Sequence, residues 1–128
     1  MSVERANEFA AAVRAIKRGV SILVSLNSGS AAAAITVKMI DAWESLIKSD
    51  VDKSLSDLWS CAFAIQRVLY NAMSERFDKK SEHAVAAECL ASDCKYRDAY
   101  KQYSIGNSEI SAGTGMEVLF LECKDESI

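Results

Sequence analysis

The stretch VSILVSLNSGSAAAAIT, from Val20 to Thr36, decides the fold of this chain. An apolar β-branched run, a polar break with one glycine and an alanine-rich segment are compatible with three structures: a strand leading into a phosphate-binding loop, a membrane span, or the turn between two helices. Upstream, apolar residues recur every three or four positions from Ala6, and this phase continues across Gly19 into the β-branched run. The continuous phase favours a helix that reaches Val24, followed by a turn.

The chemistry of the polar break supports the turn. Residues 27–29 (NSG) are typical turn residues, and Ser30 is placed to cap a second helix. A phosphate loop needs further glycines or a lysine directly after them, but the next lysine is Lys38. Residues 19–37 carry no charge, yet a span here would place the polar side chains of Asn27, Ser28 and Ser30, with Gly29 among them, at the bilayer centre. We therefore predict a helix turn and no stable membrane insertion.

Four main helices are expected, and no proline interrupts them. The first buries a stripe formed by Ala6, Phe9, Ala10, Val13, Ile16, Val20, Leu23 and Val24. The second runs from 31 to 48, and its broad apolar face predicts a central position. The third is capped by Asp52 or Ser54, runs through Arg76 and carries the clearest apolar stripe. The fourth runs from 82 to 102 with a mixed face.

The predicted fold class is all-α: a bundle of four main helices, mostly antiparallel because the connections are short. Residues 1–103 form the bundle, and residues 104–128 form a Gly/Ser-containing link and an apolar C-terminal segment of the same domain. The segment MEVLFLEC in this tail is compatible with a strand, a short docking helix or a partner-binding element. Large side chains expected in or near the core are Phe9, Trp43, Trp59, Phe63 and Leu69.

Composition limits the function classes. The chain has 128 residues and a formal net charge of -3, which argues against strong, sequence-independent attraction to nucleic acid or an anionic membrane. Its four cysteines are irregularly spaced in a domain large enough to fold without disulfides, which indicates a reducing compartment. Glu4 and Glu8 stand where a signal peptide would carry basic and then apolar residues. We expect a cytoplasmic protein.

Catalytic and metal-binding patterns are weak. The best ligand cluster is His83, Cys89 and Cys94, but two cysteines five positions apart suit zinc poorly and no second pair completes the set. His83 lies near a helix start, with no recognisable nucleophile motif. We expect no cofactor, no metal and no catalytic residues, hence no enzyme activity, although a site assembled only by the fold would escape this reasoning.

Local basic clusters give the alternative function, a helical RNA- or DNA-binding protein. Phosphate contacts would come from Arg14, Lys17, Arg18, Arg76, Lys79 and Lys80. A third cluster is formed by Lys95, Arg97 and Lys101, beside tyrosines available for base stacking. Acidic residues are interspersed among these clusters, so dispersed solubilising charge explains them equally well.

The leading prediction is a non-enzymatic protein–protein interaction module, such as a small subunit, an accessory protein, or an inhibitor or immunity protein of a larger partner. Interfaces are built around aromatic and aliphatic anchors. The partner-binding residues predicted on this basis are Tyr96, Tyr100, Tyr103, Val118, Leu119 and Phe120. The partner is another protein, and self-association as a homodimer is its simplest form.

Overall fold

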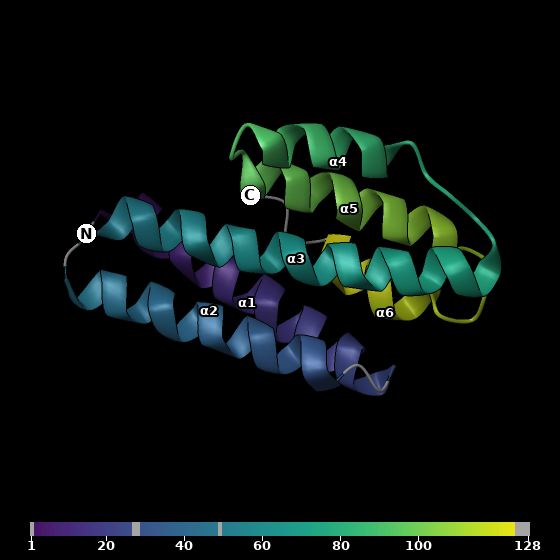
Figure 1. Cartoon of the computed structure of the whole chain (residues 1–128), viewed down its shortest axis with the longest axis horizontal. Helices are drawn as coiled ribbons and strands as arrows, with labels where there is room; N and C mark the ends of the chain where they lie inside the picture. The colour runs from purple at the N-terminus through teal and green to yellow at the C-terminus, as the bar shows by residue number, and fades with distance from the viewer. Residues whose placement is uncertain (1, 27–28, 49, 125–128) are drawn as a thin grey trace.

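The computed structural model describes residues 2–26, 29–48 and 50–124, in which the regular elements are six helices. They are α1 (Val3–Ser25), α2 (Gly29–Ile47), α3 (Val51–Phe77), α4 (His83–Ser92), α5 (Tyr96–Ser111) and α6 (Glu117–Lys124). Successive helices run in opposite directions and form a bundle in which α3 packs against α1, α2 and α5, while α4 packs on α5 (Figure 1). The predicted all-α bundle is confirmed, and the described residues form no strand.

The central helix is α3, and not the second helix as predicted. α3 packs against α1, α2 and α5 (Figure 1). It buries residues around most of its circumference, including Leu58, Trp59, Ile65 and Leu69. α2 lies at the edge of the bundle, and the neighbouring helices cover only one side of it. A broad apolar face therefore did not indicate a central position here.

α1 approaches α3 through small residues. Ala11, Ala12, Ala15 and Gly19 are buried, and a Cβ added at Gly19 would lie 2.4 Å from Cγ2 of Ile65. Because small side chains let the two backbones come close together, small residues occupy these buried positions where α1 contacts α3. The predicted stripe was wrong at its margins, where the exposed residues are Ala6, Ala10 and Val24.

The predicted fourth helix is two helices. α4 ends at Ser92 and α5 begins at Tyr96, and Cys94 between them has the left-handed φ of 57°. Because a left-handed residue cannot continue an α-helix, the chain turns back here and α5 packs beside α4. α5 then continues to Ser111, through residues expected to form a link, and the apolar tail forms the short helix α6.

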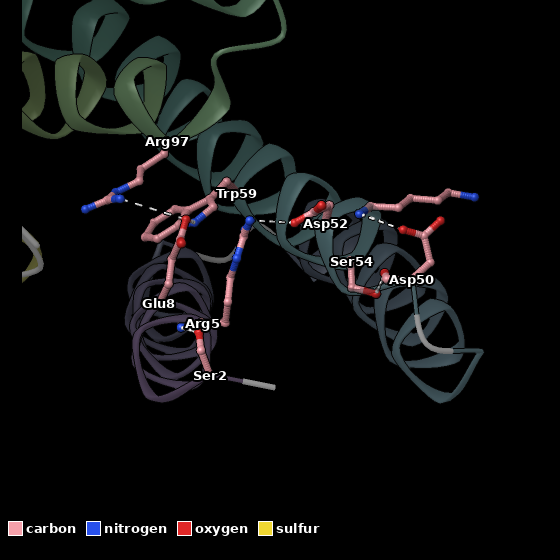
Figure 2. A network of polar contacts seen from close by, with 9 residues as sticks. Ser2, Arg5, Glu8, Asp50, Asp52, Ser54, Trp59 and Arg97 are labelled. Atoms are coloured by element: carbon pink, nitrogen blue, oxygen red, sulfur yellow. Dashed lines mark hydrogen bonds and ion pairs between the residues drawn. The ribbon is translucent and has the colours of Figure 1, made fainter.

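The cap of α3 differs from the prediction by a few residues. The Asp50 carboxylate accepts a hydrogen bond from the Lys53 backbone N–H at 3.1 Å, in place of Asp52 or Ser54 (Figure 2). Ser54 instead donates its hydroxyl to the Asp50 carbonyl at 2.8 Å. Asp50 thus satisfies one of the N–H groups that the first turn of a helix leaves unpaired.

The opening stretch is helical on both sides of its break. α1 extends to Ser25, which confirms the helix predicted across residues 20–24. The predicted turn residues Asn27 and Ser28 lie outside the described residues, and α2 begins at Gly29, so Ser30 lies inside the helix and not at the N-cap position predicted for it. In the described parts of the chain, no helix has both the length and the apolar character required to cross a membrane.

Candidate functional site

One helix exposes a stripe of large apolar side chains. On α2, Val37, Ile40, Trp43 and Ile47 are 58%, 53%, 45% and 81% exposed. Their spacing of three, three and four residues places them within an arc of about 120° on an ideal helix. We call these four residues the α2 face. Single exposed apolar residues are normal on a protein surface, whereas a contiguous group marks a contact surface.

The rest of α2 makes this stripe unusual. Ile35 and Ala42 are buried on the side facing α3, where the Cys61 thiol donates to the Ile35 carbonyl at 3.5 Å. Only Lys38, Asp41 and Glu44 are charged between Gly29 and Ile47. A helix that is apolar around most of its circumference is typical of one covered on more than one side. α2 therefore carries more apolar surface than the neighbouring helices of the bundle bury.

The α2 face borders α1 along one edge. The Trp43 ring packs against the ring of Phe9, with centroids 5.7 Å apart. Exposed Ala6 lies about one turn before Phe9 and half-buried Val13 about one turn after it, so apolar surface continues along this flank of α1. Trp43, which was expected in the core, sits at this edge with nearly half of its surface in water.

A second surface brings together residues predicted for two different functions. An open groove of about 340 Å³ between α1 and α6 is lined by Lys17, Arg18, Ser21, Ile22, Ser25, Val118 and Leu119. The Val118 side chain is 67% exposed, and Leu119 is also exposed. The groove therefore combines an apolar strip from α6 with two cations from α1, although these residues lie about 100 positions apart in the sequence.

The remaining basic residues only partly converge on this groove. Arg76 reaches Met116, the residue before α6, with 3.9 Å between its Nη1 and the methionine sulfur. Arg14, Lys79 and Lys80 are exposed. Cations from α1 and from the end of α3 thus both approach α6 at residues 116–119.

Most of the predicted aromatic anchors lie inside the molecule. Tyr100, Tyr103 and Phe120 are buried, and Tyr96 is half-buried against the core. The rings of Tyr96 and Tyr103 both pack against Phe63 of α3, with centroids 6.0 and 5.5 Å away. The buried Tyr100, Tyr103 and Phe120 are not available to a partner in this fold, whereas Val118 and Leu119 are exposed and half-buried Tyr96 lines the edge of open surface pockets.

A charged network joins α3, α4 and α5. Arg67 donates two hydrogen bonds to the Glu88 carboxylate, at 2.9 Å from Nε and 2.8 Å from Nη2, and the Tyr103 hydroxyl donates to the same carboxylate. Partial burial raises the pKa of Glu88, but these hydrogen bonds outweigh it and hold the pKa below its usual value. Burial and the neighbouring carboxylate raise the pKa of Tyr103, so its hydroxyl remains a donor.

The cluster around the only histidine also joins helices. His83 Nδ1 lies 2.8 Å from Gln102 Oε1, and its Nε2 lies 3.2 Å from Glu109 Oε1. Ser81 donates its hydroxyl to Glu109 at 2.8 Å and not to the imidazole. A serine nucleophile needs a base that accepts its proton, usually a histidine, so this geometry ties the start of α4 to α5 and does not activate Ser81.

The cysteines differ in their surroundings. Burial raises the pKa of the Cys61 thiol to about 11, which keeps it protonated and unreactive at neutral pH. Cys89 and Cys94 are exposed free thiols. Among the residues that the structure describes, no three His, Cys, Asp or Glu side chains are grouped closely enough to hold a metal ion.

The N-terminal ends of α1, α3 and α5 are joined by polar contacts (Figure 2). Trp59 Nε1 donates to Glu8 Oε1 at 3.3 Å, and Arg97 Nη1 lies 3.8 Å from the same oxygen. Arg5 of α1 pairs with Asp52 of α3 at 2.8 Å. Each of these contacts connects two helices, so the network fixes how α1 and α5 sit on α3.

Sequence reasoning did not identify the α2 face as a surface. Its signal was present in the broad apolar face of that helix, but this face was assigned to the interior. Comparisons with protein-family models, with curated proteins and with solved structures find no match. The candidate site is therefore argued from this chain alone.

Proposed function

We propose that this protein is a non-enzymatic protein–protein interaction module that docks onto its partner through the α2 face. The observation that carries the proposal is the exposed stripe of Val37, Ile40, Trp43 and Ile47 along one side of α2. A tryptophan flanked by aliphatic residues is the kind of anchor that dominates binding energy at interfaces. The module would serve as a small subunit, accessory protein or inhibitor of that partner.

The polar clusters favour this role over catalysis. The Arg67–Glu88 pair joins α3 to α4, and the contact of His83 with Glu109 joins α4 to α5. Charged groups used in this way hold helices in register. The proposal includes a cytoplasmic location, which is supported by the free thiols of Cys61, Cys89 and Cys94.

The test places a photo-crosslinking amino acid at Ile47, the most exposed position of the α2 face, in the cells from which the protein comes. A matched probe at Val85, an exposed apolar position on α4, serves as the control. The protein captured from Ile47 and not from Val85 is then purified, and its affinity is measured for the wild type, Ile40→Asp and Val85→Asp. We expect Ile40→Asp to weaken binding at least tenfold and Val85→Asp to leave it unchanged.

Two outcomes would overturn the proposal. Equal affinity of the Ile40→Asp variant would remove the α2 face from the interface. Nuclease-sensitive capture of nucleic acid, with affinity that falls steeply as salt rises, would support the alternative function. That alternative is motivated by the approach of Lys17, Arg18 and Arg76 to α6, and Lys17→Glu with Arg76→Glu would then abolish binding.

A further inference from the structure

We propose that the groove between α1 and α6 is a second docking site, and that its occupant is an acidic peptide segment of a partner protein with aliphatic side chains beside its carboxylates. This inference goes beyond the proposed function, because no residue of the α2 face lines the groove. Two features of the lining carry it: the sign of the charges and the aliphatic strip next to them.

The charges that line the groove are of one sign. Lys17 and Arg18 of α1 supply them, and the other described lining residues are serines and aliphatic residues, with no carboxylate among them. The whole chain carries a formal net charge of -3, so a groove with cations only is a local departure from its acidic character. Because a surface of one sign favours partners of the opposite sign and disfavours cationic ones, the groove selects an anionic ligand.

The wall formed by α6 is aliphatic. Phe120 is fully buried and fixes α6 on the bundle, whereas its neighbours Val118 and Leu119 are exposed and line the groove. Ile22 of α1 lines the groove as well. Exposed aliphatic side chains in a hollow gain free energy when the apolar groups of a partner cover them. The ligand should therefore carry aliphatic groups in addition to its negative charge.

The length of the groove matches a short peptide. On α1 its lining includes the row Lys17, Ser21 and Ser25, which is about 12 Å long at 1.5 Å per residue. About four residues of extended chain cover that distance at roughly 3.3 Å per residue. The cations stand at one end of this row, so we expect the peptide carboxylate within about four residues of the aliphatic side chains.

This lining fits phosphate-bearing ligands less well. Single-stranded nucleic acid is held by a track of cations together with aromatic rings that stack on its bases, and none of the described residues lining the groove is aromatic. The acyl chain of a lipid would be covered best in an enclosed apolar cavity, whereas this groove is open. A peptide supplies carboxylates and aliphatic side chains a few residues apart, so it satisfies both walls.

The experiment begins with a library of short random peptides displayed on phage and selected on the full-length chain. The double variant Lys17→Glu and Val118→Asp is used to remove peptides that bind elsewhere on the molecule. We expect the selected peptides to share an aspartate or glutamate within about four residues of two aliphatic residues.

The affinity of the best selected peptide is then measured by fluorescence anisotropy, with circular dichroism to confirm that each variant is folded. Lys17→Glu should weaken binding about tenfold, because an attraction to the peptide carboxylate becomes a repulsion, and Val118→Asp should weaken it at least tenfold. Lys48→Glu and Val85→Asp are the matched controls and should not change the affinity, since both residues are exposed and lie outside the groove. Ile40→Asp should not change it either, because the α2 face is a separate surface.

Four results would overturn the inference: a selection that enriches no common sequence, selected peptides rich in lysine or arginine, unchanged affinity in Lys17→Glu or Val118→Asp, or an equal loss of affinity in Ile40→Asp. Vesicles that contain phosphatidylserine and a single-stranded oligonucleotide are tested beside the peptide. If one of these binds through Lys17 and no acidic peptide does, the groove is a phosphate site and the peptide partner is refuted. Crosslinking from Ile47 decides the proposed function separately, so each of the two surfaces can fail without the other.

Discussion

The two tryptophans of this chain lie on the neighbouring helices α2 and α3 and differ in burial. Trp59 of α3 is 3% exposed, with its indole N–H donated to Glu8 and its ring against Tyr100. Trp43 of α2 is 45% exposed and packs on one edge against Phe9. Both helices present an amphipathic pattern in the sequence, so the difference comes from how many sides of each helix the bundle covers.

An apolar pattern indicates that a helix face is buried against a neighbour, but it does not show whether the same chain or another molecule provides that neighbour. α3 is covered by α1, α2 and α5 of the same chain. α2 is packed on α3 and touches α1 along one edge, and its remaining apolar arc is the α2 face. Mutations that cost stability should therefore lie on α3, and mutations that change association should lie on α2.

The largest expected effect separates the two tryptophans directly. Trp59→Ala should lower the free energy of unfolding by about 3–5 kcal/mol, because it removes buried surface and leaves a cavity. Trp43→Ala should cost about 1–2 kcal/mol, since much of that ring is already in water. Urea unfolding at a concentration low enough to keep the chain monomeric measures both. Equal losses for the two variants would contradict the contrast between the covered and the open helix.

The second effect concerns the contact that seats α1 on α3. Gly19→Ala should destabilise by about 1–3 kcal/mol, because the new methyl group would overlap Ile65 in a close-packed interior. Gly106→Ala is the matched control, since its Cβ would lie at an ordinary 3.4 Å from Ser81 and alanine favours the helix by up to about 1 kcal/mol. Thermal unfolding of both variants checks the pair, and a stable Gly19→Ala would show that α1 does not sit this close to α3.

The helices themselves were largely predictable, because hydrophobic periodicity and the absence of proline are local signals. The continuous phase across Gly19 correctly predicted that α1 reaches the break. The errors lie where tertiary contacts decide. The break at Cys94 depends on one left-handed residue, and the buried row of α1 depends on how closely Ile65 approaches. Neither has a signature in the sequence.

The candidate site was harder to predict than the helices. Whether Ile40 and Ile47 face the core or the solvent depends on which neighbours pack against α2, and no local pattern encodes that. Tyr100 and Tyr103 were predicted as interface anchors, and in the fold both are buried where α5 packs on α3. The predicted docking role stays a prediction for Val118 and Leu119, which are exposed.

A third effect probes the polar side of the α3–α5 contact. The Asn107 side-chain amide donates to the Gln66 side-chain oxygen at 2.7 Å, and both residues are buried. Asn107→Ala should cost about 1–3 kcal/mol, because the oxygen of Gln66 loses its donor while remaining buried. Ser104→Ala on the same helix removes a buried hydroxyl that has no hydrogen-bond partner, so it should be neutral or slightly stabilising. Chemical unfolding of the two variants would contradict this account if their order were reversed.

The smallest effect is the pH dependence of the link between α3 and α4. Because the pKa of Glu88 is lower in the folded chain than its usual 4.5, its contribution to stability is complete above that value. The contribution is lost as the pH falls through the lowered folded value, since the protonated carboxyl no longer accepts the charged hydrogen bonds from Arg67. Wild type should therefore be more stable than Glu88→Gln at neutral pH, and the two should converge in acid.

The measurement is the urea midpoint of both proteins across this pH range. Glu88 is nearly half exposed, so solvent screens the pair and the difference should be the smallest of the four. Exposed Glu75→Gln serves as the control for acid effects that do not involve Arg67. A gap between wild type and Glu88→Gln that stayed constant from neutral to acidic pH would mean that the carboxylate charge does not hold α4 to α3, and that packing against α5 alone positions that helix.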